Sequence, residues 1–234
     1  TLHWACQFLG VVITPVNWRA TDDELGYILD DAGAAAVVFE AVSEAAVAAA
    51  TASRSLPRIR VGAASAVSDV VDFASLLEDG DGTLSDPVCT PDDTSVMLYT
   101  SGTTGRGKGV PRSHRAERAA ALAHVAQNLY RFGESTLGVM PLYHTMGVRS
   151  LLAMALVNGC FVCLPRFDVD RALALIETHR ISTLYLVPTL YHDLVHHPRF
   201  READVSTVRK LGFAGAPMTD GSVSYTHLTL PTMI

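Results

Sequence analysis

Apolar residues recur along the chain in two patterns: short continuous runs, and stripes spaced three or four positions apart. The runs are typical of buried strands, and the stripes are typical of helices that bury one face. The strand-like runs are residues 37–39, 95–99 and 160–164. The helix-like stretches are residues 21–33, 41–52 and 114–128. The alternation of the two patterns from Val11 to Gly215 predicts an α/β fold, with layered parallel or mixed sheets and flanking helices.

One helix carries its own start and stop signals. Thr21 and Glu24 have the spacing of a capping box, in which each side chain bonds the backbone of the other residue. Leu25 and Leu29 form a stripe on one face, and Gly33 is placed to end the helix. Further along, residues 78–93 are crowded with Asp, Gly, Pro and Thr, which predicts a surface loop or linker.

Composition narrows the class of protein. Apolar residues make up 49% of the chain, which is enough for a core, and the net charge of −6 gives no support for nucleic-acid binding. The most apolar stretch, residues 151–164, is interrupted by Asn158 and Gly159 and is too short to span a bilayer. The 4 cysteines are scattered, which predicts a reducing, cytoplasmic location and no disulfide framework.

Two groups of Cys and His residues are poor candidates for a metal site. Cys160 and Cys163 lie three positions apart in a predicted strand, so their side chains point to opposite faces. His192, His196 and His197 lie beside a proline at a predicted helix end, where polar side chains are common. We therefore predict no protein metal site.

The segment 98–111, LYTSGTTGRGKGVP, is dense in hydroxyl side chains, glycines and cations. Glycines let backbone N–H groups approach an anion closely, and Lys108 adds a mobile positive charge suited to terminal phosphates. The segment follows a predicted strand and precedes a helix that Ser113 can cap. The residues expected to hold the phosphates of a nucleotide are Thr100, Ser101, Gly102, Thr103, Thr104, Gly105 and Lys108.

Two other interpretations of this segment were weighed. Gly102, Gly107 and Lys108 reproduce most of a Walker A loop, but Gly109 stands where that loop needs a hydroxyl for magnesium. A plain solvated turn would rarely carry so dense a run directly after a buried strand.

Residues 99–105, YTSGTTG, match letter for letter the first part of the signature YTSGTTGxPKG of the adenylate-forming superfamily. The chain therefore resembles acyl-CoA synthetases, aryl-CoA ligases, luciferases and the adenylation domains of peptide synthetases. Gly107 departs from the pattern, because it replaces the usual proline. Loss of a fixed φ angle should loosen the loop and weaken its hold on phosphate.

Three later segments resemble that superfamily in the same order. The run 138–147, GVMPLYHTMG, resembles the segment that lines the acid pocket, and 183–194 resembles a strand and helix beside the cleft. The run 208–218, VRKLGFAGAPM, resembles the turn that passes between the acid and the adenine. The resemblance implies that the acid-binding residues are Tyr143, His144, Met146 and Thr189, and that the nucleotide also contacts Gly215, Ala216 and Pro217.

The resemblance implies an AMP-forming acid–thiol ligase that uses ATP, Mg²⁺ and coenzyme A. The carboxylate displaces pyrophosphate from ATP, and a thiol then displaces AMP. The run PLYHTMGV has no acidic residue to pair with a substrate ammonium, which favours an acid without an α-amino group. We favour an aromatic or short cyclic acid. A peptide-synthetase adenylation domain and a non-catalytic nucleotide-binding module remain alternatives.

The end of the sequence breaks the pattern. Residues 222–234 resemble a translated sequencing adapter, so we expect a non-native tail after a partial N-terminal adenylation domain over residues 1–221. On that expectation the superfamily's later catalytic motifs, including its terminal lysine, are missing. No catalytic residue is then assigned within the chain, and the fragment alone would be inactive.

Overall fold

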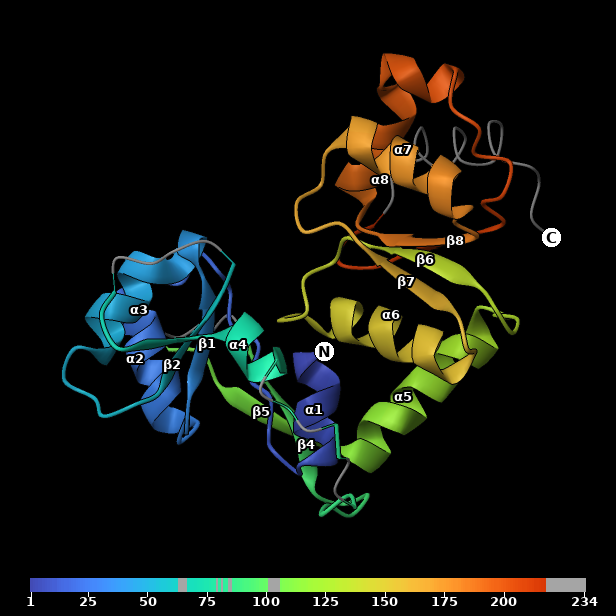
Figure 1. Ribbon diagram of the computed structural model, residues 1–234. Coiled ribbons are helices and arrows are strands. Elements are labelled where there is room, and N and C mark those ends of the chain that lie inside the picture. The colour runs from blue at the N-terminus through green and yellow to red at the C-terminus, as the bar shows by residue number, and fades with distance from the viewer. Residues whose placement is uncertain (63–66, 79, 81, 84–85, 101–105, 218–234) are drawn as a thin grey trace. The chain divides into compact units, whose positions relative to one another are not determined.

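A computed structural model describes residues 1–62, 67–78, 80, 82–83, 86–100 and 106–217. It divides into two compact units, Thr1–His114 and Arg115–Ile234 (Figure 1). The expected tail over residues 222–234 lies outside the described residues and stays a prediction.

The first unit is built around a small parallel sheet in the order β1-β2-β3. Its elements are α1 (Leu2–Phe8), α2 (Asp22–Asp31), β1 (Val37–Glu40), a 3-10 turn (Ala41–Ser43), α3 (Glu44–Thr51), β2 (Arg58–Val61), β3 (Val70–Asp72), α4 (Phe73–Glu78), β4 (Thr94–Tyr99) and β5 (Gly109–Ser113). Helices α2 and α3 pack with β1 around Leu25, Leu29, Val37, Phe39, Val47 and Ala50. The capping box at the start of α2 is confirmed, with both of its hydrogen bonds present.

Strands β4 and β5 form a separate antiparallel pair. The predicted strand at 95–99 is thus confirmed as β4. Near Val11, where the alternation of patterns was expected to begin, a parallel bridge joins Ile13 to Val96. Pro15 follows closely and has no N–H to extend a ladder.

The second unit is a four-stranded parallel sheet in the order β7-β6-β8-β9. Its elements are α5 (His114–Gln127, which begins at the unit boundary), β6 (Ser135–Gly138), α6 (Thr145–Leu156), β7 (Cys160–Cys163), α7 (Val169–His179), β8 (Thr183–Leu186), α8 (Pro188–His196), a 3-10 turn (Pro198–Arg201) and β9 (Lys210–Phe213). Helices α7 and α8 cover one face of the sheet, and α6 lies on the other (Figure 1). The α/β class with parallel and mixed pairing is confirmed.

Side chains are closely packed on both faces of the sheet in this unit. The main core contains fully buried Leu173, Ile176 and Leu186 between the sheet and its α7–α8 layer. At the end of β6, a Cβ on Gly138 would lie 2.1 Å from the Phe161 ring, so only glycine fits beside β7.

The groups dismissed as metal ligands behave as separate surface residues. Cys160 and Cys163 are both exposed on β7, an edge strand, and neither forms a disulfide. His192 and His196 are exposed near the end of α8, with their rings stacked 4.1 Å apart. Among the described residues, no group of three or more His, Cys, Asp or Glu is arranged to hold a metal ion. Within the same residues, no helix is both long and apolar enough to cross a membrane.

Candidate active site

The described ends of the phosphate segment are closed by backbone hydrogen bonds. Thr100 N–H donates to Lys108 O at 3.1 Å, and Lys108 N–H donates to Thr100 Oγ1 at 3.4 Å. Tyr99 pairs with Gly109 in the antiparallel register just below. The two described ends of the segment therefore lie side by side, and Lys108 at its return is exposed. The expected phosphate ligands Ser101, Gly102, Thr103, Thr104 and Gly105 lie outside the described residues.

Two of its glycines are required by close contacts. A Cβ on Gly107 would lie 2.5 Å from Thr100 O, and a Cβ on Gly109 would lie 2.9 Å from Met97 Sδ and 3.0 Å from Tyr99 Cζ. Gly107, which the sequence marks only as a missing proline, thus permits the close return of the chain past Thr100.

The hairpin is also attached to α2. Tyr99 Oη donates a 2.6 Å hydrogen bond to Asp31 Oδ2, and the Tyr99 ring meets the Tyr27 ring edge-on at 6.3 Å. The Arg106 guanidinium lies 5.0 Å from the centre of the Tyr27 ring. Partial burial, followed by the Asp31 carboxylate, raises the pKa of Tyr99, so its hydroxyl remains a donor at neutral pH.

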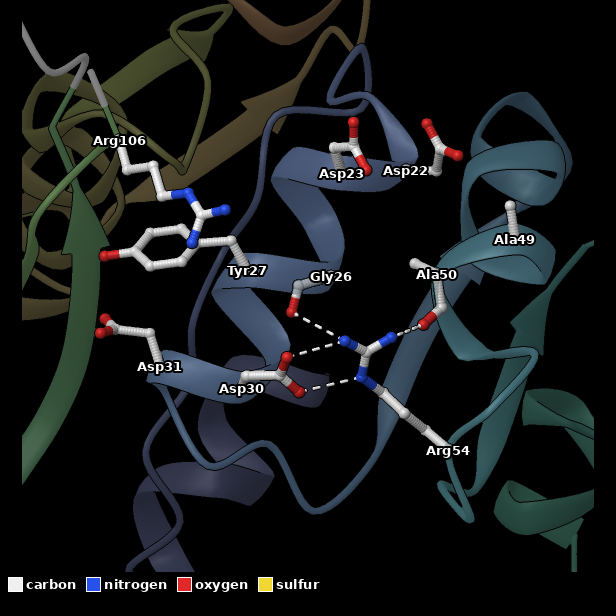
Figure 2. A pocket seen from close by; sticks show the side chains of 10 residues that line it. All are labelled: Asp22, Asp23, Gly26, Tyr27, Asp30, Asp31, Ala49, Ala50, Arg54 and Arg106. Atoms are coloured by element: carbon white, nitrogen blue, oxygen red, sulfur yellow. Dashed lines mark hydrogen bonds and ion pairs between the residues drawn. The ribbon is translucent and has the colours of Figure 1, made fainter.

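These contacts border a polar cavity of about 580 Å³ between α2 and α3. Arg54 crosses its floor, bonding Asp30 Oδ2 at 2.7 Å, Asp30 Oδ1 at 2.9 Å and the carbonyl of Ala50, as Figure 2 shows. The residues that line it are Asp22, Asp23, Gly26, Tyr27, Asp30, Asp31, Ala49, Ala50, Arg54 and Arg106. The cavity could not be predicted from the sequence, because its walls come from separate parts of the chain.

In the second unit, parallel pairing brings the expected acid-site residues to one edge of the sheet. Tyr143 and His144 follow β6, Thr189 follows β8, and Gly215 follows β9. Carboxyl ends of parallel strands meet at the same edge, which is where open α/β sheets bind ligands. The residues are thus placed on a common edge by topology and not by sequence proximity.

The β6 end forms a tight turn into α6. His144 precedes the helix, and its carbonyl accepts from Gly147 N–H at 3.0 Å, while its side chain is exposed. The Tyr143 and His144 rings are in contact, 4.6 Å between centres. A Cβ on Gly147 would lie 2.2 Å from Pro141 O, so glycine lets the helix start against the turn. Met146, half-buried, lies in the first turn of α6.

The β8 and β9 ends contact one another. Pro188 begins α8, as predicted, and places exposed Thr189 in the first turn. Gly215 has φ +91°, and a Cβ there would lie 3.3 Å from Val187 Cγ1. Exposed Ala216 and Pro217 follow this glycine.

The family model described as AMP-binding enzyme matches residues 1–231. The chain belongs to this family. It is 31% identical over 219 residues to a feruloyl-CoA synthase of Amycolatopsis sp, covering 92% of this chain and 41% of that protein. It is 28% identical over 225 residues to the long-chain-fatty-acid–CoA ligase FadD13 of Mycobacterium tuberculosis, covering 95% and 43%.

A solved structure gives the same result for the fold. The ATP-bound MatB structure from Rhodopseudomonas palustris has a TM-score of 0.82 and 27% identity, covering 97% of this chain and 44% of that one. The AMP-binding chain therefore spans less than half the length of these proteins. Its predicted resemblance to adenylate-forming enzymes is confirmed, and the Walker A and plain-turn interpretations are set aside.

Proposed function

We propose that this chain carries the ATP-phosphate and acid-binding parts of an AMP-forming acid:coenzyme A ligase. The observation that carries the proposal is the β4–β5 hairpin, whose ends at Thr100 and Lys108 are closed by mutual hydrogen bonds in a chain of the AMP-binding family. In the first step, a substrate carboxylate oxygen attacks the α-phosphorus of ATP and pyrophosphate leaves. In the second, the thiol of coenzyme A forms the thioester, and AMP departs with the carboxylate oxygen.

The residues of this chain act by positioning and by neutralising charge. Lys108 is exposed at the return of the hairpin, where it can pair with the phosphates that leave. Thr100 and the glycine and hydroxyl residues of the loop offer donors to the same oxygens. Mg²⁺ would come with the ATP as part of the substrate, and the described residues offer no cluster of His, Cys, Asp or Glu to hold it.

The acid side is proposed for the carboxyl edge of the β7-β6-β8-β9 sheet. Tyr143 and His144 offer paired rings, with Met146 and Thr189 on neighbouring helix starts. The segment 139–148 contains no carboxylate, and a buried ammonium without a partner is costly, so the acid should lack an α-amino group. Paired aromatic side chains favour a flat aromatic or short cyclic acid, which the feruloyl-CoA synthase relative supports.

Two other functions are less well supported. An adenylation domain of a peptide synthetase would need an acidic residue for its amino acid, and a non-catalytic module would not need an acid site. None of the 4 cysteines forms a disulfide, which supports the proposal that the protein works in the reducing cytoplasm.

The deciding experiment is acid-dependent ATP–pyrophosphate exchange by the longest product of the gene that encodes this chain. The acids to be compared are benzoate and cinnamate derivatives, fatty acids of increasing length, and the α-amino acid phenylalanine. Exchange with aromatic acids but not with phenylalanine supports the proposal. Exchange with phenylalanine alone would make it an amino-acid adenylation domain, and ATP binding without any exchange would make it a binding module.

A further inference from the structure

Two side chains of helix α2, one turn apart, contact the two described borders of the phosphate segment, Tyr99 and Arg106. We propose that Asp31 and Tyr27 are positioning residues that fix these borders and so hold Thr100 and Lys108 in place for phosphate. The inference rests on the proposed function, because it concerns how the phosphate segment is held. Neither residue lies in the signature that identifies the segment.

The first border is held at Tyr99, the last residue of β4. Its hydroxyl donates to the Asp31 carboxylate at 2.6 Å, a short distance typical of charge-assisted bonds. The Tyr99 ring lies between the Tyr27 ring and Gly109, where a Cβ would come within 3.0 Å of Tyr99 Cζ. The ring is thus confined from the α2 side and from β5, and Thr100 follows it directly.

The second border is held at Arg106. Its guanidinium lies over the Tyr27 ring at 5.0 Å, and Figure 2 shows the two side chains facing each other beside the cavity. Arg106 is followed by Gly107 and then by Lys108, whose carbonyl accepts from Thr100. Tyr27 therefore contacts both ends of the loop, one by a ring edge and the other by its face.

Helix α2 is a firm support for these contacts. Its start is fixed by the Thr21–Glu24 capping box, and Leu25 and Leu29 are buried in the core of the first unit. Binding residues that are held by packed helices and strands keep their geometry better than residues on free loops. A residue that is already held in place also loses less conformational entropy when the ligand binds, so the affinity is higher.

Asp30 supplies a matched control. It precedes Asp31 on α2, lines the same cavity and also makes an ionic contact, but its partner Arg54 lies away from the hairpin. A role in stability alone predicts similar effects at both aspartates. A positioning role predicts that only Asp31 and its partner Tyr99 affect phosphate binding.

The test compares Tyr99→Phe, Asp31→Ala, their double variant and Asp30→Ala in the longest product of the gene that encodes this chain. Calorimetry measures Kd for MgATP and for magnesium pyrophosphate, with circular dichroism as the check on folding. We expect about tenfold weaker binding for Tyr99→Phe and for Asp31→Ala, since a hydrogen bond to a charged group is lost. The double variant should be no weaker than either single one, and Asp30→Ala should bind as the wild type does.

A second readout needs no nucleotide. Trypsin cleaves the Arg106–Gly107 bond at the second border, and mass spectrometry compares its rate with cleavage at exposed Arg19 as the internal reference. Tyr27→Leu, Tyr99→Phe and Asp31→Ala should speed cleavage at Arg106 about fivefold or more relative to Arg19. Asp30→Ala should leave the ratio unchanged.

The two readouts separate the α2 clamp, by which we mean the Asp31–Tyr99 and Tyr27–Arg106 contacts, from the proposed function. If the wild-type chain binds neither ligand but the three variants still expose Arg106, the phosphate assignment fails and the α2 clamp stands as a structural feature. Unchanged cleavage ratios overturn the clamp, whatever the affinities. Faster cleavage with unchanged Kd values overturns its role in phosphate binding.

Discussion

Glu134 and Lys210 form a salt bridge across the amino edge of the second sheet, although 76 residues separate them. Glu134 is 1% exposed and also accepts from Ser182 and, at 3.1 Å, from Arg209. The pair joins the starts of β6, β8 and β9, at the end of the sheet opposite the proposed acid site. It therefore sets the alignment of the strands whose other ends carry Tyr143 and Gly215.

We predict that Glu134→Gln lowers the free energy of unfolding by about 3 kcal/mol, because it leaves the largely buried Lys210 ammonium without its counter-charge. Urea unfolding measures the effect. The matched control is Arg209→Ala, which removes the half-exposed partner of the same carboxylate and should cost less than about 1 kcal/mol. Equal losses in the two variants would contradict a special role for the buried pair.

A second prediction concerns His124, a buried residue of α5. Its ring contacts Tyr130 and Tyr185, and burial, with a smaller contribution from Arg149, lowers its pKa to about 4. The unfolded chain, with a histidine pKa near 6.5, then binds the proton more readily than the folded one. Stability should therefore fall as the pH drops from about 6.5 to about 4, by up to about 3 kcal/mol.

Urea unfolding at closely spaced pH values measures this dependence. His124→Phe keeps an aromatic ring between the two tyrosines and should flatten the curve over the same range. Exposed His192→Phe is the control and should leave the curve unchanged. A wild-type curve that is flat between pH 6.5 and 4 would contradict the buried neutral histidine.

The third prediction uses Gly107. The family pattern alone suggests that restoring proline would tighten the loop, whereas the 2.5 Å approach of a Cβ to Thr100 O indicates a clash. We expect Gly107→Pro and Gly107→Ala each to lower stability by about 1–3 kcal/mol and to weaken ATP binding, because Thr100 and Lys108 must separate. Calorimetry and urea unfolding measure both. Tighter ATP binding by Gly107→Pro would show that the loop closes along another path.

Local features of the fold were readable from the sequence. The Thr21–Glu24 capping box, the β4 run and the proline start of α8 each depend on residues a few positions apart, and all three are confirmed. The bridge from Ile13 to Val96 was not readable, because it depends on a pairing partner that a single run of apolar residues does not reveal.

The site was only partly readable for the same reason. The signature identifies the hairpin, and strand order brings His144 and Gly215 to one edge. The bond from Tyr99 to Asp31 spans 68 residues, and an aspartate at a helix end carries no local sign of its partner. Likewise, Arg106 occupies a variable position of the signature, so only the structure reveals its contact with Tyr27.

The last prediction tests the acid side separately from the phosphate side. In the longest product of the gene, His144→Ala should raise the KM for the acid about tenfold and leave the KM for ATP unchanged, because His144 and Tyr143 lie together at the end of β6. Lys108→Ala should do the reverse, since we propose that its charge pairs with phosphate and not with the acid. Exchange kinetics with each substrate varied in turn measure both constants. Equal effects of His144→Ala on the two KM values would place this histidine outside the acid pocket, and the carboxyl edge of the sheet would then lose its strongest candidate for contact with the acid.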